Sequence, residues 1–338
     1  KPIVYVNNVG GQTDVICDGS SAFINSRGEA IALLKSFEED FQIVDCDADN
    51  EPIKFPKQNK TVNVFKAIKL GLKDYFSKNG FEKACLGLSG GIDSAVVLSM
   101  AVEALGPQNV RVLLMPSQFS SDHSVEDARK LAENLGVEYQ IVPINETFAA
   151  LTTTLGPVFG ELPFNVAEEN MQSRIRGMMM MAISNKFGNV LLSTANKSEI
   201  ATGYGTLYGD MVGALSIIGD LYKSEVYDLA RYINRDKEII PINTIMNDPS
   251  AELRLEQKDS DSLPPYDILD AILYRMIEEG QSREEIINAG FDEEEVYRVY
   301  NMVLTSEFKR YQYCPTLRLS TCTLGINRHL PLTNKYGY

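Results

Sequence analysis

The sequence predicts an α/β protein: a doubly wound, mainly parallel sheet with a helical C-terminal extension and a short β segment at the N-terminus. Two observations carry this prediction. From residue 83 onward, short apolar runs typical of strands alternate with segments of helical periodicity, which is the pattern of βαβ units with right-handed crossovers. Between the first such strand and helix, residues 89–94 read SGGIDS, a glycine-containing turn of the kind that holds phosphate.

The N-terminal segment predicts antiparallel strands. The runs DVIC, SAFIN and EAIALL, within residues 14–34, are short and apolar, and the turn sequences DGS and SRG separate them. Three strands are too few for a core of their own, so we expect residues 1–45 to be the end of a domain that begins upstream. Residues 46–60 are polar and contain two prolines, which indicates a linker, and residues 61–338 form the main domain.

The main domain begins with a helix over residues 61–80, whose apolar side chains recur at helical spacing and whose end is marked by Gly80. Strands and helices then alternate until about residue 195, and the last third is helical. The expected strands are residues 83–88, 110–116, 138–144 and 189–195. Three more helices are expected before the last third: one starts at Ser94, one runs from about 122 to 135, and one runs from about 165 to 187 and ends at Gly188. The helices expected in the last third are 266–280, 282–290 with a capping box Ser282–Glu285, and 292 to about 311.

Composition narrows the classes of function. The chain has 338 residues, with 32 basic and 46 acidic side chains, and its net charge of −14 argues against a general nucleic-acid-binding protein. No apolar run approaches the roughly 20 residues that span a membrane. The five cysteines form no C-x-x-C pair, which argues against zinc and fits a reducing, cytoplasmic environment. With only two histidines, the chemistry has to rely on carboxylates, lysines, hydroxyls and backbone amides.

The SGGIDS turn has the features of a pyrophosphate site. Its two glycines let backbone N–H groups approach an anion closely, its serines add hydroxyl donors, and the following helix directs its positive end at the same place. Asp93 is explained if Mg²⁺ lies between its carboxylate and the phosphate oxygens. The alternative is a tight strand-to-helix turn with a capping serine. We expect ATP phosphates at Ser89, Gly90, Gly91, Ile92, Asp93 and Ser94.

This turn resembles the signature of the ATP pyrophosphatases, enzymes that cleave ATP between the α and β phosphates. The resemblance implies a Rossmann-like fold of the adenine nucleotide alpha hydrolase type, ATP as co-substrate, and adenylation of an oxygen of the second substrate. Further blocks resemble NAD synthetases, in the same order along the chain. They are residues 115–136, 168–188, 191–211, 221–232 and 258–273, together with EFKRYQ and NRHLPLTNKY near the C-terminus.

The N-terminal segment resembles the end of another domain. Residues 5–21, YVNNVGGQTDVICDGSS, and the tetrapeptide FEED are similar to the last strands of the nitrilase-like α/β sandwich that serves as the glutaminase domain of glutamine-dependent NAD synthetases. The resemblance implies that the Glu-Lys-Cys triad of that domain lies upstream of Lys1, so we expect this chain to be a segment of a longer protein. Cys17 is not that nucleophile.

The resemblance also implies site residues. Thr194 joins the ATP site, and Mg²⁺ is held by Asp93 and Glu199. The residues implied for deamido-NAD are Asn170, Arg174, Arg176, Glu199, Asp210 and Lys309, and those implied in catalysis are Asp93, Lys223 and Asp210. Adenine or ribose contacts are expected from Ser117, Ser120 and Ser121. The alternatives are a helix cap for residues 193–199, solvated surface charges for the two lysines, and ordinary turns for the three serines.

The helix expected over residues 165–187 has two faces. Glu169, Gln172 and Arg176 recur at steps of three and four residues and predict a polar face. The side chains expected to cover the opposite, apolar side are Met171, Ile175, Met178 and Met179.

The function implied by the resemblance is the ATP-dependent amidation of deamido-NAD to NAD, with ammonia supplied by the glutaminase domain and with AMP and pyrophosphate released. The family also implies a homo-oligomer, and neither nucleic acid nor membrane is an expected partner. Two alternatives stay open: another ATP pyrophosphatase, such as a GMP synthetase or a tRNA-thiolating enzyme, and a non-catalytic nucleotide-binding module of the universal-stress type.

Overall fold

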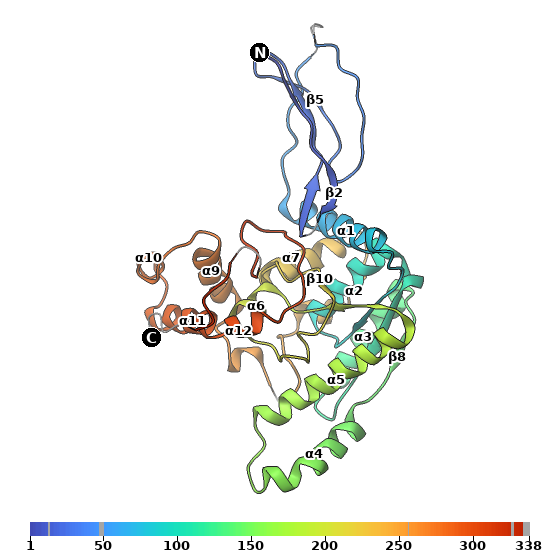
Figure 1. Cartoon of the computed structure of the whole chain (residues 1–338), viewed down its shortest axis with the longest axis vertical. Coiled ribbons are helices and arrows are strands. Elements are labelled where there is room, and N and C mark those ends of the chain that lie inside the picture. Colours follow the sequence, from blue (N-terminus) through green and yellow to red (C-terminus); the bar gives the residue numbers. More distant parts are fainter. Residues whose placement is uncertain (13, 47–50, 256, 326–327, 334–338) are drawn as a thin grey trace.

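A five-stranded parallel sheet lies at the centre of the molecule, in the strand order β10-β9-β6-β7-β8 (Figure 1). The computed structural model describes residues 1–12, 14–46, 51–255, 257–325 and 328–333. The chain runs from β6 to β8 on one side and then returns to the other side of β6. In open parallel sheets, ligands bind in the crevice outside the carboxyl ends of the strands at such a reversal, which here are the ends of β6 and β9. The strands are β6 (Ala84–Gly87), β7 (Val110–Leu114), β8 (Tyr139–Ile141), β9 (Val190–Ser193) and β10 (Leu215–Ser216).

Helices cover both faces of this sheet, as the doubly wound prediction requires. Side chains alternate along β6, so that Ala84 and Leu86 join a core with one set of helices while Cys85 joins a core with the other set. The first set is α1 (Lys60–Asn79), α2 (Ile92–Leu105), α3 (Asp122–Leu135) and α7 (Lys223–Ile233), and the second is α4 (Asn145–Phe159) and α5 (Val166–Phe187).

Several helices begin or end where the sequence predicted, at residues that cap them. Gly80, Gly136 and Gly188 end α1, α3 and α5 in the left-handed conformation, with φ of 72°, 67° and 66°. Asn165 caps the start of α5 through a capping box with Glu168. Such caps depend on the residues within a turn of the helix, so they can be identified without tertiary information.

The N-terminal segment forms the antiparallel strands that were predicted, together with two strands that were not, β1 and β2. A hairpin of β2 (Val9–Gln12) and β3 (Val15–Asp18) lies against α1, where Gly11 N donates to Asp74 at 2.8 Å and Lys78 donates to the Gly11 carbonyl at 2.9 Å. A second sheet projects away from the main body (Figure 1). Its strands are β1 (Ile3–Tyr5), β4 (Ala22–Ile24) and β5 (Ala30–Leu33).

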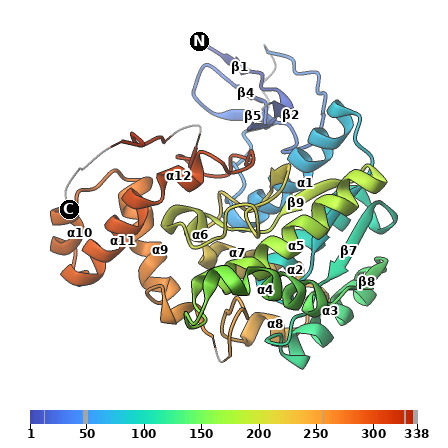
Figure 2. The ribbon, with the colours of Figure 1, turned by 60° about the horizontal axis from the view of Figure 1, so that its bottom comes forward.

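The C-terminal third is helical, as predicted, and has its own buried core beside the sheet (Figure 2). Its α10 has the predicted capping box between Ser282 and Glu285. Apart from α7, the helices after β9 are α6 (Lys197–Thr202), α8 (Ile242–Met246), α9 (Tyr266–Ile277), α10 (Arg283–Asn288), α11 (Glu293–Thr305) and α12 (Glu307–Arg310). Among the described residues, 3-10 turns form at η1 (Pro107–Asn109) and η2 (Asp259–Asp261). Within the part of the chain that the structure describes, no helix combines the length and apolarity needed to cross a membrane.

The single helix expected from residue 292 to about 311 is wrong. Ser306 interrupts it between α11 and α12, because the Ser306 hydroxyl is buried and donates to the Thr202 carbonyl at 2.9 Å. Helix α4 was not predicted, since it contains three successive threonines and a proline, and α7 and α8 were not predicted either.

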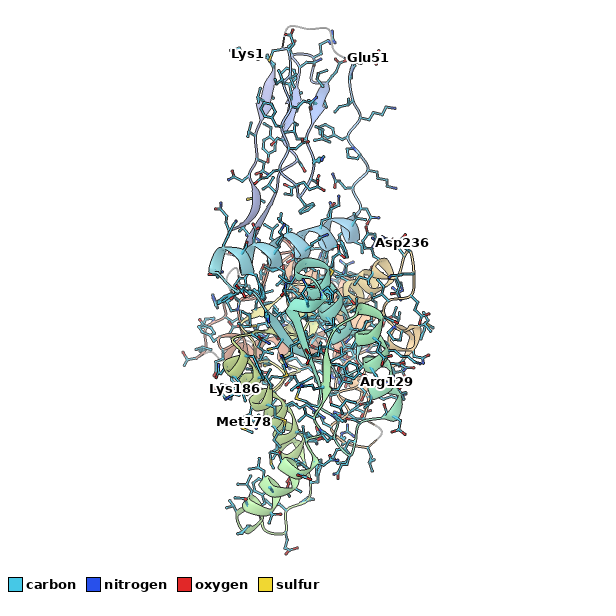
Figure 3. All side chains as sticks on the ribbon, turned by 90° about the vertical axis from the view of Figure 1, so that its right-hand side faces the viewer. Lys1, Glu51, Arg129, Met178, Lys186 and Asp236 are labelled. Carbon is cyan, nitrogen blue, oxygen red and sulfur yellow. The ribbon has the colours of Figure 1, made fainter. Side chains whose placement is uncertain are left out.

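The two faces predicted for α5 are also partly wrong. Gln172 is fully buried and its amide donates to the Leu253 carbonyl at 2.8 Å, because the chain segment around Leu253 packs over this side of the helix. Met178 is 60% exposed and points outward (Figure 3), whereas Met171 and Ile175 are buried as expected.

Candidate active site

The glycine turn lies between β6 and α2 and is held by its own serines. Ser94 Oγ donates to the Gly91 carbonyl at 3.0 Å and accepts from Ser89 N at 3.3 Å, and Gly91 N donates to Ser89 Oγ at 3.2 Å. Gly90 has φ of 90°, and a Cβ there would lie 2.2 Å from the Ser124 carbonyl oxygen, so only glycine fits. The first turn of α2 has no side-chain cap, which leaves its N–H groups directed at a space suited to an anion.

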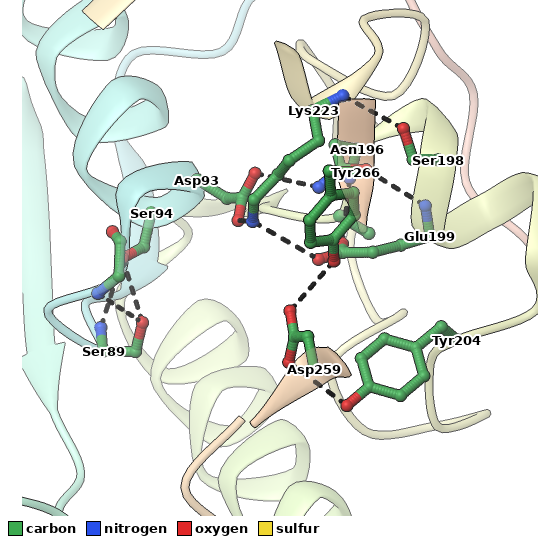
Figure 4. Close-up of polar contacts among 12 residues, drawn as sticks. Ser89, Asp93, Ser94, Asn196, Ser198, Glu199, Tyr204, Lys223, Asp259 and Tyr266 are labelled. Atoms are coloured by element: carbon green, nitrogen blue, oxygen red, sulfur yellow. Dashed lines mark hydrogen bonds and ion pairs between the residues drawn. The ribbon is translucent and has the colours of Figure 1, made fainter. Parts of the chain in front are cut away.

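A charged cluster lies beside this turn (Figure 4). Lys223, the first residue of α7, donates to Asp93 Oδ2 at 2.5 Å, and its ammonium lies 3.9 Å from Glu199 Oε1. Asn196, the N-cap of α6, donates to Asp93 Oδ1 at 2.9 Å. Three helices, α2, α6 and α7, thus bring together Asp93, Glu199 and Lys223.

Burial and charge set the protonation of this cluster. Burial lowers the pKa of Lys223, but the carboxylates of Asp93 and Glu199 outweigh it, so the pKa is raised overall and the amine stays an ammonium. Burial and the neighbouring Asp93 raise the pKa of Glu199 well above its usual range, and the Lys223 ammonium opposes them. The cluster therefore carries a fixed cation and a carboxylate that binds a proton or a cation readily.

Asn196 orients Glu199, and the structure confirms the helix cap that the sequence analysis gave as the alternative for residues 193–199, although Asn196 itself was not named there. Its Oδ1 accepts from Glu199 N at 3.0 Å, while Glu199 Oε2 accepts from Asn196 N at 3.1 Å. This capping box leaves Glu199 Oε1 as the oxygen that faces Lys223. The signal was present in the sequence, since N-x-x-E directly after a buried strand is typical of a helix start.

A third carboxylate, Asp259, was also missed. It is buried and accepts from the Tyr266 hydroxyl at 2.9 Å and from the Tyr204 hydroxyl at 3.2 Å (Figure 4). The Lys223 ammonium lies 5.2 Å from the centre of the Tyr266 ring, within the range of a cation–π contact. Burial raises the pKa of Asp259, and Lys223 lowers it. Tyr266 is only seven positions from Asp259, but Tyr204 is 55 positions away, so the sequence around Asp259 does not show this second contact.

A second group of expected residues surrounds the loop that follows α6. Asn170 accepts from Thr206 Oγ1 at 2.6 Å, and Arg174 donates to the Leu207 carbonyl at 3.2 Å. Asp210 accepts from Thr206 N at 2.7 Å. Lys309, from α12, donates to the carbonyl oxygens of Gly203 and Gly205, both at 2.7 Å. The loop of residues 203–210 thus contains Asp210 and is contacted by the side chains of Asn170, Arg174 and Lys309.

The remaining expected residues lie elsewhere around the crevice. Thr194 directly follows β9 and is half-buried. Ser121 caps α3, and its hydroxyl donates to Glu252 at 2.6 Å, while Ser117 and Ser120 form a turn with each other. Arg176 donates to the Met115 carbonyl at 2.9 Å, and the carboxylate of Asp210 in the 203–210 loop acts on it electrostatically. Cys17 lies in β3, outside the crevice.

Comparison with known proteins identifies the family. Residues 64–313 match the family model described as NAD synthase. The chain is 48% identical to the glutamine-dependent NAD(+) synthetase of Synechocystis sp. and 42% identical to that of Thermotoga maritima, in each case over 99% of this chain. It spans 61% and 65% of the length of these two relatives.

Solved structures agree with this result. The glutamine-dependent NAD+ synthetase of Acinetobacter baumannii, in complex with ADP, matches 98% of this chain and 61% of its own, with 40% identity and a TM-score of 0.71. The NMN synthetase of Francisella tularensis matches 74% of this chain and 95% of its own, with 26% identity and a TM-score of 0.64. Because the family match covers most of the chain and includes the glycine turn and the charged cluster, this chain belongs to the NAD synthase family.

Proposed function

We propose that this chain is the synthetase part of a glutamine-dependent NAD synthetase, which amidates deamido-NAD to NAD with ATP and ammonia. The observation that carries the proposal is the cluster of Asp93, Glu199 and Lys223 beside the glycine turn, at the reversal of the strand order. The names of the relatives in Synechocystis and Thermotoga support the choice of reaction.

In the first step, the nicotinate carboxylate of deamido-NAD attacks the α-phosphorus of ATP, which forms an adenylate and releases pyrophosphate. The N–H groups of the glycine turn bind the leaving pyrophosphate, with Thr194 at the side of the nucleotide. The ammonium of Lys223 stabilises the negative charge that develops on the phosphate oxygens, and it is effective because it is buried and already oriented by Asp93.

In the second step, ammonia attacks the activated carbonyl, and AMP leaves. We place deamido-NAD on the 203–210 loop, where the side chains of Asn170, Arg174, Asp210 and Lys309 converge. Asp210 lies at the nicotinate end in this arrangement, where its carboxylate accepts the proton that the attacking nitrogen loses. Exclusion of water from the crevice protects the adenylate from hydrolysis.

The residues present fit Mg²⁺. Asp93 and Glu199 place two carboxylates against one ammonium, so the cluster has an excess of negative charge, and carboxylate oxygens are the ligands that Mg²⁺ prefers. These two side chains would hold the ion, and phosphate oxygens and water would complete its shell, since the described residues contain no group of three or more side chains arranged for a metal. When bound, Mg²⁺ neutralises charge on the ATP phosphates.

We also propose the organisation of the longer protein. Residues 1–45 are the end of a nitrilase-type glutaminase domain that supplies ammonia, residues 46–60 link it to the synthetase domain, and residues 61–338 form that domain. The alignment supports this, because two relatives named for glutamine dependence match 99% of this chain with 61% and 65% of their own length. The protein is placed in the cytoplasm and assembles as a homo-oligomer, as the family resemblance implies.

The test is NAD formation from deamido-NAD, ATP and Mg²⁺, with ammonium and glutamine as separate nitrogen donors. We expect activity with ammonium and none with glutamine, and we expect Asp93→Ala to abolish it. A parallel reaction offers the mononucleotide counterpart of deamido-NAD, because of the likeness to an NMN synthetase. If the protein amidated the mononucleotide and not deamido-NAD, the proposed substrate would be wrong. If Asp93→Ala kept full activity, the proposed site would be wrong.

A further inference from the structure

Arg176 is a half-buried arginine without a carboxylate partner. Its Nε donates to the Met115 carbonyl at 2.9 Å. Within the described ranges, no carboxylate oxygen lies within the 4.0 Å of an ion pair from its guanidinium. An arginine that makes only one main-chain hydrogen bond keeps most of its five donors for another group.

The contact with Met115 places this guanidinium beside the glycine turn. Strands β6 and β7 are parallel, Gly87 pairs with Leu113, and Leu88 N donates to the Leu113 carbonyl at 2.9 Å. Met115 directly follows β7, and its side chain lies against Gly87, where a Cβ would be 3.1 Å from Met115 Cε, two residues before the turn begins at Ser89. Arg176 therefore approaches the turn from the β7 side, while Lys223 approaches it from the β9 side.

The charges around Arg176 do not neutralise it. Burial lowers the pKa of Arg176 to about 10, and the more distant carboxylates of Glu252 and Asp210 oppose this effect. Both carboxylates are already bonded elsewhere, Glu252 by the hydroxyls of Ser121 and Ser124 and Asp210 by Thr206 N. A guanidinium that is partly removed from water without an ion-pair partner destabilises the free protein, and such a group is typical of an anion site.

We propose that Arg176 binds the polyphosphate of ATP, opposite Lys223, and that it belongs to the ATP site rather than to the deamido-NAD site that the family resemblance implied. Arg174, two residues earlier on α5, is exposed and bonded to the 203–210 loop, so the two arginines of this helix serve different substrates. A planar guanidinium can bind two phosphate oxygens at once, which Lys223 cannot do. This inference rests on the proposed function.

The experiment compares Arg176→Met and Arg176→Lys with Arg174→Met in ammonium-dependent NAD formation, varying ATP and deamido-NAD separately. We expect Arg176→Met to raise the KM for ATP by about ten- to a hundredfold, the usual effect of a lost hydrogen bond to a charged group. Its KM for deamido-NAD should change little, and Arg174→Met should show the reverse pattern. Arg176→Lys, which keeps the charge, should lie between Arg176→Met and the wild type in its KM for ATP.

A thermal-melting assay gives a readout that does not depend on turnover. We expect free Arg176→Met to melt at or above the temperature of the wild type, because an uncompensated buried charge has been removed, and to lose most of the stabilisation that ATP confers on the wild type. A variant that melts lower but keeps the ATP-induced shift would make Arg176 a structural residue and overturn the inference. A raised KM for deamido-NAD with an unchanged KM for ATP would also overturn it. If the wild type itself makes no NAD, the proposed function fails, whereas the melting assay still decides whether Arg176 binds ATP.

Discussion

At the scale of single residues, the candidate site depends on one buried ammonium among several carboxylates. Lys223 is 2% exposed and is influenced by Asp93, Glu199 and Asp259. Their combined charge keeps the lysine protonated, and the excess of negative charge favours a cation in the site. The same arrangement is unfavourable for folding, as is common where a site is built for chemistry.

Lys223→Met should lower kcat/KM for NAD formation on the order of 10²–10³, because a preorganised cation is lost where negative charge develops. Steady-state kinetics with saturating ammonium measures this. Lys69→Met is the matched control, since the Lys69 ammonium is exposed and pairs only with Glu103 at 2.6 Å on the surface, and it should leave the rate nearly unchanged. Equal rates for the two variants would remove Lys223 from the mechanism.

Glu199→Gln should change stability in a pH-dependent way. The pKa of Glu199 is raised in the folded state from the ordinary value of 4.5, so its proton favours folding below that value, and this contribution is lost as the pH rises through the folded pKa. A glutamine does not titrate. The free energy of unfolding of the variant should therefore equal that of the wild type near about pH 4 and exceed it near about pH 8. Urea denaturation at both pH values measures the difference.

Glu285→Gln supplies the control of opposite sign. Hydrogen bonds from Ser282 lower the pKa of Glu285, so its carboxylate favours folding above its unfolded pKa, and this contribution is lost as the pH falls through the folded pKa. Glu285→Gln should therefore lower the free energy of unfolding near about pH 8, whereas Glu199→Gln should raise it. If both variants shifted stability in the same direction, the proposed burial effect at Glu199 would be wrong.

At the scale of elements, the site requires α2 and α3 to begin close together. Gly90 makes this approach, because its Cα lies against the main chain of Ser124 in the first turn of α3. The N-terminus of α3 is in turn covered by Glu252, whose carboxylate accepts from the hydroxyls of Ser121 and Ser124 at 2.6 and 2.8 Å. The candidate site is thus bounded by α2 and α3, and these helices can lie this close together because residue 90 is a glycine and has no side chain.

Gly90→Ala should abolish ATP binding, whereas Gly136→Ala should not. Both glycines have positive φ, 90° and 67°, so each substitution costs about 1–2 kcal/mol of backbone strain. A Cβ at Gly90 would also meet the Ser124 carbonyl, while nothing lies within 4 Å of a Cβ at Gly136. Calorimetric titration with ATP and thermal melting separate the shared strain from the specific clash, and ATP binding by Gly90→Ala at wild-type affinity would contradict the assignment of the turn.

At the scale of the whole molecule, a buried lysine joins the C-terminal segment to the site region. Lys197 is fully buried, lies 2.9 Å from Asp220 Oδ1 and also pairs with Glu278 of the α9 C-terminus. Asp220 Oδ2 accepts from Leu319 N and Ser320 N, both at 2.7 Å. This network connects α6, which carries Glu199, to α9 and to the chain after α12.

Lys197→Met should lower the free energy of unfolding by about 3–5 kcal/mol, because it leaves two buried carboxylates without their cation. Lys130→Met, which removes an exposed ammonium 3.9 Å from Glu126, should change it by less than about 1 kcal/mol. Chemical denaturation monitored by tyrosine fluorescence compares the two. A small effect at Lys197 would mean that water replaces the lost ammonium.

The sequence by itself determined the alternation of strands and helices, the glycine turn and several helix ends, since each depends on residues close together in the chain. Periodicity and caps predicted α3 at its observed bounds, 122–135. They did not predict α4, whose threonines disfavour helix, or the break at Ser306, which a contact with Thr202 decides. The sequence also could not show which side of α5 is buried, because the burial of Gln172 depends on the distant segment at Leu253.

Only the tertiary structure decided how the site is assembled. Lys223 and Asp93 are 130 positions apart, and Asn196 is 103 positions from Asp93, so no local pattern records their contact. Asp259 lies in the block of residues 258–273, to which the sequence analysis gave no individual role, and it joins the site through two tyrosine hydroxyls. Caps and turns follow from energies within a few residues, whereas the charged cluster follows from the order of parallel strands, which brings together the ends of segments that are remote in sequence.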